Sequence, residues 1–291
     1  MKILERPLLK NKTSATGILL FVVLGVLPFA AAFIYALLYS FGLVGVISSG
    51  FTTEFWVSVI KTGSFFKSLG YSAAIAGIAV FLSVVIALWL TLKFKSALEN
   101  KFILMMVYMP LAIPGLATAF FIIQLLAKGG FLSRISYASG LINESNEFPD
   151  LVNDNLALGI ILAFLTMIIP FFMLLFLNVY KNERVEELRI LAYSLGATSR
   201  QVRNKVVLPI LLKKTRVLIA LYFIFLLGSY EVPLILGQES PQMISVLVIQ
   251  ELKQYDLDKI PEGYVVAVMY TIVVAIAAVF LFLPRKKEQY V

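Results

Sequence analysis

Six long stretches of the chain are mostly apolar, and together they contain a single charged residue, Glu231. Each has about 20 residues or more, which is enough for a helix to cross a hydrocarbon layer of about 30 Å. Within lipid, only a helix or a closed barrel can satisfy its own backbone hydrogen bonds. The sequence therefore predicts an all-α integral membrane protein with six transmembrane helices, over residues 18–38, 68–92, 102–127, 155–180, 217–238 and 263–284.

The composition agrees with lipid as the main partner of this chain. Hydrophobic residues make up 60% of the 291 positions and charged residues only 14%, whereas soluble domains carry about 25% charged residues. The net charge is +8, but the basic residues fall between apolar stretches and not on one face of a soluble domain. This distribution argues against a nucleic-acid partner.

The basic residues also predict the orientation of the chain. If the six stretches alternate across the membrane, 19 of the 25 Lys and Arg residues lie on one side. Because basic loops remain in the cytoplasm, both termini and the long polar segment 181–216 are predicted to be cytoplasmic. The first stretch follows a basic segment, as in a signal peptide, but it is longer and lacks a small-residue cleavage site, so we expect it to be retained.

The chain divides into three parts on this topology. Residues 1–64 would hold the cytoplasmic N-terminus, the first transmembrane helix and an outer loop; residues 65–285 the main transmembrane domain; and residues 286–291 a cytoplasmic tail. Two outer loops are acidic. They are interpreted either as solvated linkers or as a docking site for an extracytoplasmic partner.

Several kinds of chemistry are excluded by the residues that are missing. The chain has no Cys and no His, which removes thiol nucleophiles, imidazole bases and the usual zinc or haem ligands. An intramembrane enzyme would need paired acids or a comparable cluster, and the spans supply one Glu. A Gly-x4-Gly-Lys-[Ser/Thr] phosphate loop is also absent. We therefore predict no catalytic residues, no metal site and no ATP binding by this chain.

The cytoplasmic segment 185–209 has the pattern of a helix, a turn and a second helix. Apolar residues recur at three- and four-residue steps from Val185 to Leu195, which predicts a short amphipathic helix. Gly196 can adopt the left-handed conformation that ends a helix, and Thr198, followed three residues later by Gln201, resembles a capping box. Pro209 lacks an amide hydrogen and predicts a bend before the fifth span.

This segment resembles the cytoplasmic signature loop of binding-protein-dependent ABC importer permeases. That signature reads Glu-Ala-Ala, three residues, Gly, nine residues, Ile, any residue, Leu-Pro. Ala192, Gly196, Leu208 and Pro209 match it, and Val206 stands for the Ile. The first two positions hold Ile190 and Leu191 instead, so the signature's glutamate is missing. The nearest acids are Glu186 and Glu187, about one turn earlier.

The resemblance implies a type I ABC permease fold in which this segment is a coupling helix seated on a separate ATPase. The contact tip would be the four residues Leu195, Gly196, Ala197 and Thr198. It further implies the bacterial inner membrane, two ATPase subunits that bind ATP and Mg, a second permease subunit, more often different than identical, and an extracytoplasmic solute-binding protein. The alternative interpretation is an amphipathic helix lying on lipid, which the basic residues would favour.

Five residues are candidates for the substrate pathway: Tyr230, Glu231, Pro233, Pro114 and Pro170. A carboxylate facing lipid would cost roughly 2.5–3.5 kcal/mol, so Glu231 should face protein or water. It would favour a cationic substrate or shape the gate of the pathway. Alternatively, it would form a structural pair with a neighbouring helix or extend towards the outer membrane interface. The prolines can kink their helices. The segments around Pro114 and Glu231 also resemble those of permeases for polyamines and other small solutes.

The main rival function is an ATP-independent secondary transporter. Such a protein would be expected to carry charged pairs in several spans. Only one intramembrane charge is present here, and this favours the ATP-driven importer.

Overall fold

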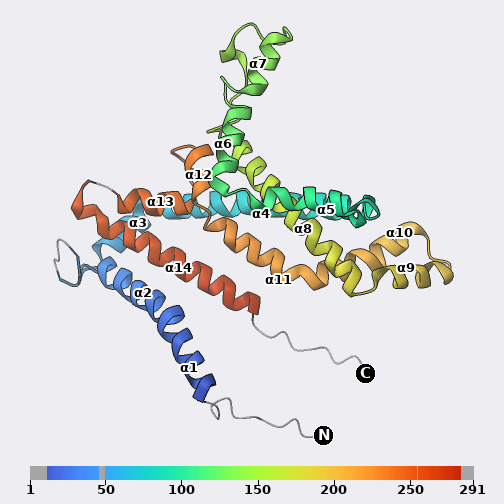
Figure 1. The fold of residues 1–291 in the computed structure, drawn as a ribbon. Helices are drawn as coiled ribbons and strands as arrows, with labels where there is room; N and C mark the ends of the chain where they lie inside the picture. Colours follow the sequence, from blue (N-terminus) through green and yellow to red (C-terminus); the bar gives the residue numbers. More distant parts are fainter. Residues whose placement is uncertain (1–11, 46–49, 254, 283–291) are drawn as a thin grey trace. The chain divides into compact units, whose positions relative to one another are not determined.

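The computed structural model describes residues 12–45, 50–253 and 255–282, which form helices joined by turns and loops, with no strand among them (Figure 1). The all-helical prediction is confirmed. The described residues divide into two compact units, one within 1–65 and 248–272 and the other within 66–247 and 273–291. The predicted tail 286–291 lies outside the described residues, as do the first eleven residues.

Aromatic stacking joins the helices of the first unit. The ring of Tyr39 stacks on that of Tyr264 with 4.2 Å between the ring centroids, and Tyr35 approaches both rings edge-on. Offset-stacked and edge-to-face ring pairs of this kind hold two helices at a fixed spacing. The elements are α1 (Lys12–Phe21), the π-helical η1 (Val22–Val26), α2 (Leu27–Ser40), α3 (Glu54–Thr62), the end of α13 (Ile244–Leu252), η6 (Leu257–Lys259) and the first half of α14 (Ile260–Phe282).

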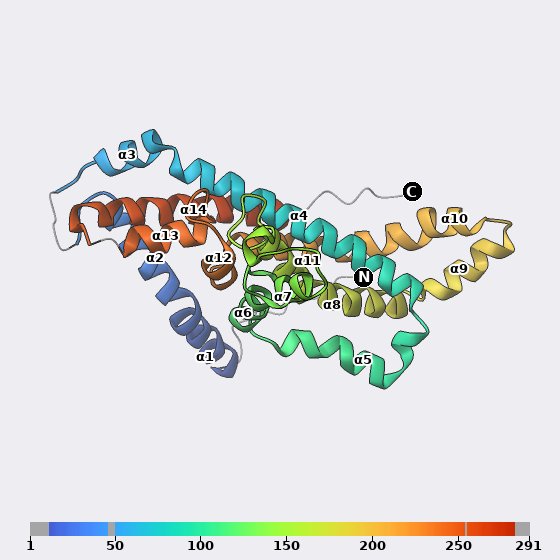
Figure 2. The same cartoon turned by 90° about the horizontal axis from the view of Figure 1, so that it is seen from above.

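The second unit holds most of the chain. Its elements are α4 (Ser64–Lys93), η2 (Ala97–Glu99), α5 (Lys101–Tyr108), η3 (Met109–Ala112), α6 (Gly115–Leu126), α7 (Phe131–Ala138), η4 (Ser145–Glu147), α8 (Leu158–Asn182), α9 (Val185–Ser194), α10 (Ser199–Val202), η5 (Arg203–Val207), α11 (Leu208–Leu227), α12 (Glu231–Leu236), the start of α13 (Ile244–Leu252) and the rest of α14. Figures 1 and 2 show α9 and α10 beyond the ends of α4 and α8, away from α6 and α7.

Among the described residues, five helices are long and apolar enough to cross a membrane: Thr16–Ser40, Ser64–Lys93, Gly115–Ala138, Leu158–Asn182 and Leu257–Leu281. Four of them overlap closely with the first, second, fourth and sixth predicted spans. None of the most apolar part of the first helix is buried within the chain, as expected of side chains that face lipid.

The third predicted span, 102–127, is not one continuous helix. It consists of α5 and the 3₁₀ turn η3, then a break, then α6. Pro114 disfavours helical geometry in the residue before it, and Ile113 is indeed extended, with φ −86° and ψ 121°. Pro114 itself lies at the N-cap of α6. A sliding count of apolar residues could not show this break, because the residues around it are all uncharged.

The fifth predicted span, 217–238, is also interrupted. Helix α11 ends at Leu227, and α12 begins at Glu231 after three residues that include Gly228. Pro233 stands in the first turn of α12. Backbone N–H groups there have no acceptor within the helix, so the lack of an N–H in proline costs no hydrogen bond. The two interrupted spans thus place the start of α6 and the start of α12 within the membrane-spanning part of the chain.

Helix α8 forms the centre of the second unit. Phe164, Phe172 and Phe176 on this helix are each 1% exposed or less, and Phe172 also contacts the ring of Tyr222 on α11 at 5.3 Å between centroids. Pro170 is buried inside α8, and the helix continues through it. Because TM helices have little hydrophobic driving force between them, this packing is what orders them.

One buried hydrogen bond lends itself to a stability measurement. The backbone N–H of Ile244 donates to Ser72 Oγ at 2.7 Å, and Ser72 is fully buried. We expect Ser72→Ala to lower the free energy of unfolding by about 1–3 kcal/mol, because the N–H would be left unpaired. Titration with SDS in mixed micelles would measure the loss. Ser83→Ala is the control, since Ser83 is equally buried and its hydroxyl has no hydrogen-bond partner among the described residues.

Candidate functional site

The 185–209 segment folds as the predicted helix, turn and helix. Helix α9 ends in a Schellman turn: Gly196 N–H donates to the carbonyl of Tyr193 at 2.9 Å, and Ala197 N–H donates to that of Ala192 at 3.1 Å. Gly196 has φ +83°, a left-handed conformation that suits glycine. Two carbonyl groups at the C-terminal end of α9 are therefore satisfied by the turn itself.

A capping box then starts the next helix. Gln201 N–H donates to Thr198 Oγ1 at 3.4 Å, and Thr198 N–H donates to Gln201 Oε1 at 2.8 Å. These two reciprocal bonds fix the angle at which α10 leaves the turn. Together with the Schellman turn, they hold the tip between Leu195 and Thr198 in one geometry.

Apolar residues at this tip, and on α9 just before it, are not covered by the described chain. Leu195 is 80% exposed, Ile190 61% and Leu191 57%. The sequence pattern placed Val185, Leu191 and Leu195 on one apolar face, yet only Val185 is buried. An exposed apolar group of this kind on an ordered turn is typical of a contact surface for another macromolecule.

Pro209 is accommodated by a change of helix type. Residues Ser199 to Leu227 are helical without interruption, and the turn Arg203–Val207 just before Leu208 is a π-helix. A π-turn shifts the hydrogen-bond pattern, so a helix can continue past a residue that lacks an N–H. The predicted bend at Pro209 is thus a π-helical turn, and α10 and α11 form one helical segment.

Behind the tip, Glu186 makes three short side-chain contacts. Lys95 Nζ and Tyr180 Oη each donate to Glu186 Oε2 at 2.6 Å, and an Arg189 guanidinium nitrogen donates to Oε1 at 2.6 Å. The ammonium of Lys95 also lies 4.4 Å from the centre of the Tyr180 ring. We call Lys95, Tyr180, Glu186 and Arg189 the Glu186 cluster. Lys95 and Tyr180 were not among the site residues predicted from the sequence. The one signal that could have pointed to Lys95 is its position just after the second predicted span.

The two acids near the signature differ sharply. Among the described residues Glu187 forms an ion pair with Arg184 alone, at 3.9 Å, and 69% of its side chain is exposed. Its ion pair lies at the surface, where such pairs contribute little. Of these two acids, Glu186 is therefore the one whose carboxylate is held by short contacts within the fold.

The Glu186 cluster predicts a defined pH dependence. The hydrogen bonds from Lys95 and then Tyr180 lower the pKa of Glu186 from 4.5 to about 2. A carboxylate with a lowered pKa stabilises the fold above its unfolded pKa, and this contribution is lost as the pH falls towards the folded pKa. The difference in thermal midpoint between wild type and Glu186→Gln should be constant from about pH 8 to about pH 5 and then shrink towards about pH 2. A difference that changed between about pH 8 and about pH 6 would contradict this. Glu187→Gln is the control.

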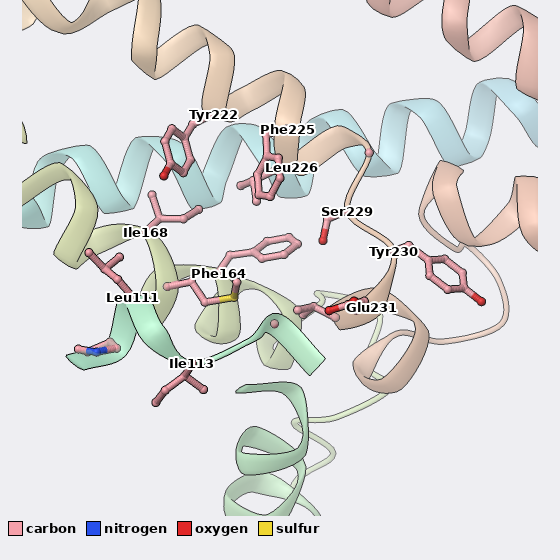
Figure 3. A pocket seen from close by; sticks show the side chains of 15 residues that line it. Leu111, Ile113, Phe164, Ile168, Tyr222, Phe225, Leu226, Ser229, Tyr230 and Glu231 are labelled. Carbon is pink, nitrogen blue, oxygen red and sulfur yellow. The ribbon is translucent and has the colours of Figure 1, made fainter. Parts of the chain in front are cut away.

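A second site is a cavity of about 450 Å³ next to the two interrupted spans. Figure 3 shows that residues of η3, α8, α11 and α12 surround it, with Phe164, Tyr222, Phe225 and Glu231 around the same space. The lining residues are Pro110, Leu111, Ile113, Gly115, Phe164, Met167, Ile168, Tyr222, Phe225, Leu226, Gly228, Ser229, Tyr230, Glu231 and Val232. Glu231 is the one acid in this lining.

Only part of the predicted pathway set lines this cavity. Tyr230 and Glu231 do; Pro114, Pro170 and Pro233 do not. Pro114 and Pro233 instead belong to the helix starts beside it, and Pro170 is buried within α8. The aromatic residues Phe164, Tyr222 and Phe225 were missed, because nothing in a membrane span distinguishes a cavity-lining ring from a lipid-facing one.

Glu231 bonds to a neighbouring helix and also lines the cavity. Leu116 N–H, in the first turn of α6, donates to Glu231 Oε2 at 3.1 Å, so the carboxylate joins the two interrupted spans. A carboxylate at a helix N-terminus is favoured by the unpaired N–H groups there. The space between them is narrow: a Cβ atom on Gly115 would lie 3.4 Å from Glu231 Oε2 and 3.4 Å from Met167. The same carboxylate faces the cavity.

The chemistry of the cavity suits a small ligand with a positive charge. Aromatic rings attract cations over their faces, and a carboxylate in a largely apolar cavity favours an opposite charge. The described residues contain no group of three or more His, Cys, Asp or Glu side chains that could hold a metal ion.

Comparison with known proteins adds two findings. The sequence model of the family described as "Binding-protein-dependent transport system inner membrane component" matches residues 83–283. Among solved structures, a chain from the crystal structure of a bacterial ABC transporter involved in the import of the acidic polysaccharide alginate matches with a TM-score of 0.65 and 14% sequence identity, over 91% of each chain. At that identity the likeness concerns the fold. Comparison with curated protein sequences finds no match.

Proposed function

This chain belongs to the family of binding-protein-dependent transport system inner membrane components, and on that premise we propose that its 185–209 segment couples the membrane helices to a separate ATPase. Family and fold make the chain a non-catalytic, multi-pass inner-membrane subunit of an ABC importer. The family implies an ATPase and a solute-binding protein as partners, and no cofactor on this chain. The coupling, the stoichiometry and the solute are our proposals.

The exposed apolar tip carries the proposal for coupling. Leu195 is 80% exposed on a turn fixed by a Schellman motif and a capping box. An amphipathic helix lying on lipid would present its apolar face along the membrane and would not require an ordered turn. A preorganised apolar tip fits a groove of a partner protein, because little entropy is lost when it docks.

The proposed assembly has two ATPases that bind ATP and Mg, a second permease subunit different from this one, and an extracytoplasmic binding protein. Alternating access would follow: ATP draws the ATPases together, the 185–209 segment is displaced, and the helices around the cavity reorient. Both termini would lie in the cytoplasm, on the side of the 185–209 segment, as the basic residues favour.

The proposed solute is a small organic cation such as a polyamine. Its support is the carboxylate of Glu231 among the rings of Phe164, Tyr222 and Phe225. The hydrogen bond from Leu116 N–H goes to Oε2, and no described residue donates to Oε1, which leaves an acceptor for an ammonium group.

The test is affinity purification of the tagged chain in mild detergent from its native membrane, followed by mass spectrometry. We expect a P-loop ATPase to co-purify. If none does, and vesicles containing the chain transport solute without ATP, the proposal is wrong and an ATP-independent secondary transporter replaces it.

A further inference from the structure

The Glu186 cluster lies where three helices meet. Lys95 stands two residues after α4 ends at Lys93, Tyr180 belongs to the last turns of α8, and Glu186 lies in the first turn of α9. One carboxylate therefore contacts the ends of two membrane helices and the start of the helix that carries the exposed tip. The residues involved are distant in sequence: Lys95 and Glu186 are 91 positions apart.

The carboxylate of Glu186 is occupied inside the chain. Oε2 accepts hydrogen bonds from Lys95 and Tyr180, and Oε1 accepts one from Arg189, all at 2.6 Å. Tyr180 is 4% exposed, and Val185 beside Glu186 is fully buried, so the cluster rests on packed side chains. Charge-assisted bonds of this length are among the stronger polar contacts in proteins.

A second ion pair holds the same region from another helix. Lys214 Nζ on α11 lies 2.8 Å from Glu183 Oε1, in the turn between α8 and α9. The start of α9 is therefore tied to the end of α4 by Glu186 and to α11 by Glu183. Movement of the start of α9 would therefore be resisted by contacts with both α4 and α11.

We propose that Glu186 is a positioning residue that transmits movement of the tip to α4 through Lys95, and that it does not contact the ATPase. This rests on the proposed function, and it assigns the ATPase contact to the apolar tip alone. Neutral substitution at either end of the Lys95–Glu186 pair should leave ATPase binding intact but weaken the response of the cavity to ATP.

The chain has no cysteine, which allows a direct test without knowledge of the solute. Ser229, which lines the cavity, is replaced by cysteine in the otherwise unchanged chain. The complex is purified with its ATPase, and the rate of maleimide labelling of this chain is measured with and without ATP plus vanadate. A coupled complex should show a change in rate of about fivefold or more, the usual lower size of an allosteric coupling.

In this background, Glu186→Gln and Lys95→Gln should each retain the ATPase, while the change in labelling rate falls below about twofold. The double variant should be no worse than Glu186→Gln alone, because the substitution of Glu186 already weakens its contact with Lys95. Lys95→Arg should retain the ATP-dependent change in labelling rate, since a guanidinium at this position can also donate to Glu186 Oε2. Two matched controls should respond as the unsubstituted chain does. Glu187→Gln changes the exposed neighbouring acid, and Lys93→Gln changes a lysine whose ammonium lies over the Trp89 ring.

Loss of the ATPase from Glu186→Gln would overturn the inference, because the carboxylate would then belong to the ATPase contact. A wild-type response in Glu186→Gln and Lys95→Gln would overturn it as well. If Glu186→Gln does not fold, Lys95→Gln and Lys95→Arg provide the same comparison from the other helix. Absence of an ATPase from the unsubstituted complex would instead refute the proposed function.

Discussion

Leu195→Asp is expected to weaken ATPase binding by about 100-fold or more. The side chain is 80% exposed at the tip of the 185–209 segment, where the proposed function has it buried against the partner. Central apolar anchors contribute about 2 kcal/mol or more to an interface, and an unpaired carboxylate buried there adds a desolvation cost. Titration of the purified permease complex with the ATPase, by surface plasmon resonance, would give the two dissociation constants.

Leu141→Asp supplies a matched control. Leu141 is 78% exposed, almost the same as Leu195, but it follows α7 in a loop predicted to lie on the opposite side of the membrane. It should bind the ATPase as wild type does. Equal weakening by both substitutions would show that a general effect on the fold is responsible, and would remove the support for a docking tip.

Substitutions at Gly196 would test the same surface by changing the backbone conformation of the tip. Its φ of +83° is unfavourable for a residue with a Cβ, although a Cβ there would meet no atom within 4 Å. Gly196→Val should therefore disturb the turn by backbone strain of about 1–2 kcal/mol, whereas Gly196→Asn should be better tolerated, because Asn adopts the left-handed conformation more readily. The bulkier Gly196→Arg should add a steric block at the tip.

Glu231→Gln is expected to reduce uptake of a cationic solute by about 10- to 100-fold, because a hydrogen bond to a charged group contributes about 1.5–3 kcal/mol. The Gln side chain keeps an oxygen that can accept from Leu116 N–H, so the link between α12 and α6 should persist. The measurement is uptake of radiolabelled spermidine into proteoliposomes that contain the whole complex.

Comparison of Glu231→Gln with Glu231→Ala separates the role of the charge from that of the hydrogen bond to Leu116. The alanine variant removes both, and should lower stability in addition to uptake. If Glu231→Gln transports spermidine at the wild-type rate while Glu231→Ala does not, the carboxylate acts only as a link between the interrupted spans. If wild type does not transport spermidine, the polyamine proposal is wrong even though the importer assignment stands.

Local signals in the sequence predicted the structure best. The turn at Gly196 and the capping box of Thr198 and Gln201 follow from neighbouring residues, and the structure has both. The third and fifth spans are not the continuous helices predicted, because their interruptions at Pro114 and Gly228 lie within apolar runs. The division of the chain at residues 64 and 285 remains a prediction.

The sequence by itself determined the class of this protein: the lengths of its apolar stretches require a helical membrane fold, and the spacing from Gly196 to Pro209 resembles one family of importers. Only the tertiary structure showed which acids form contacts with other helices. Glu186 meets Lys95 across 91 positions, and Glu231 meets Leu116 across 115. Apolar length and turn residues act through neighbours in the chain, whereas these contacts depend on how helices pack, which no local pattern encodes.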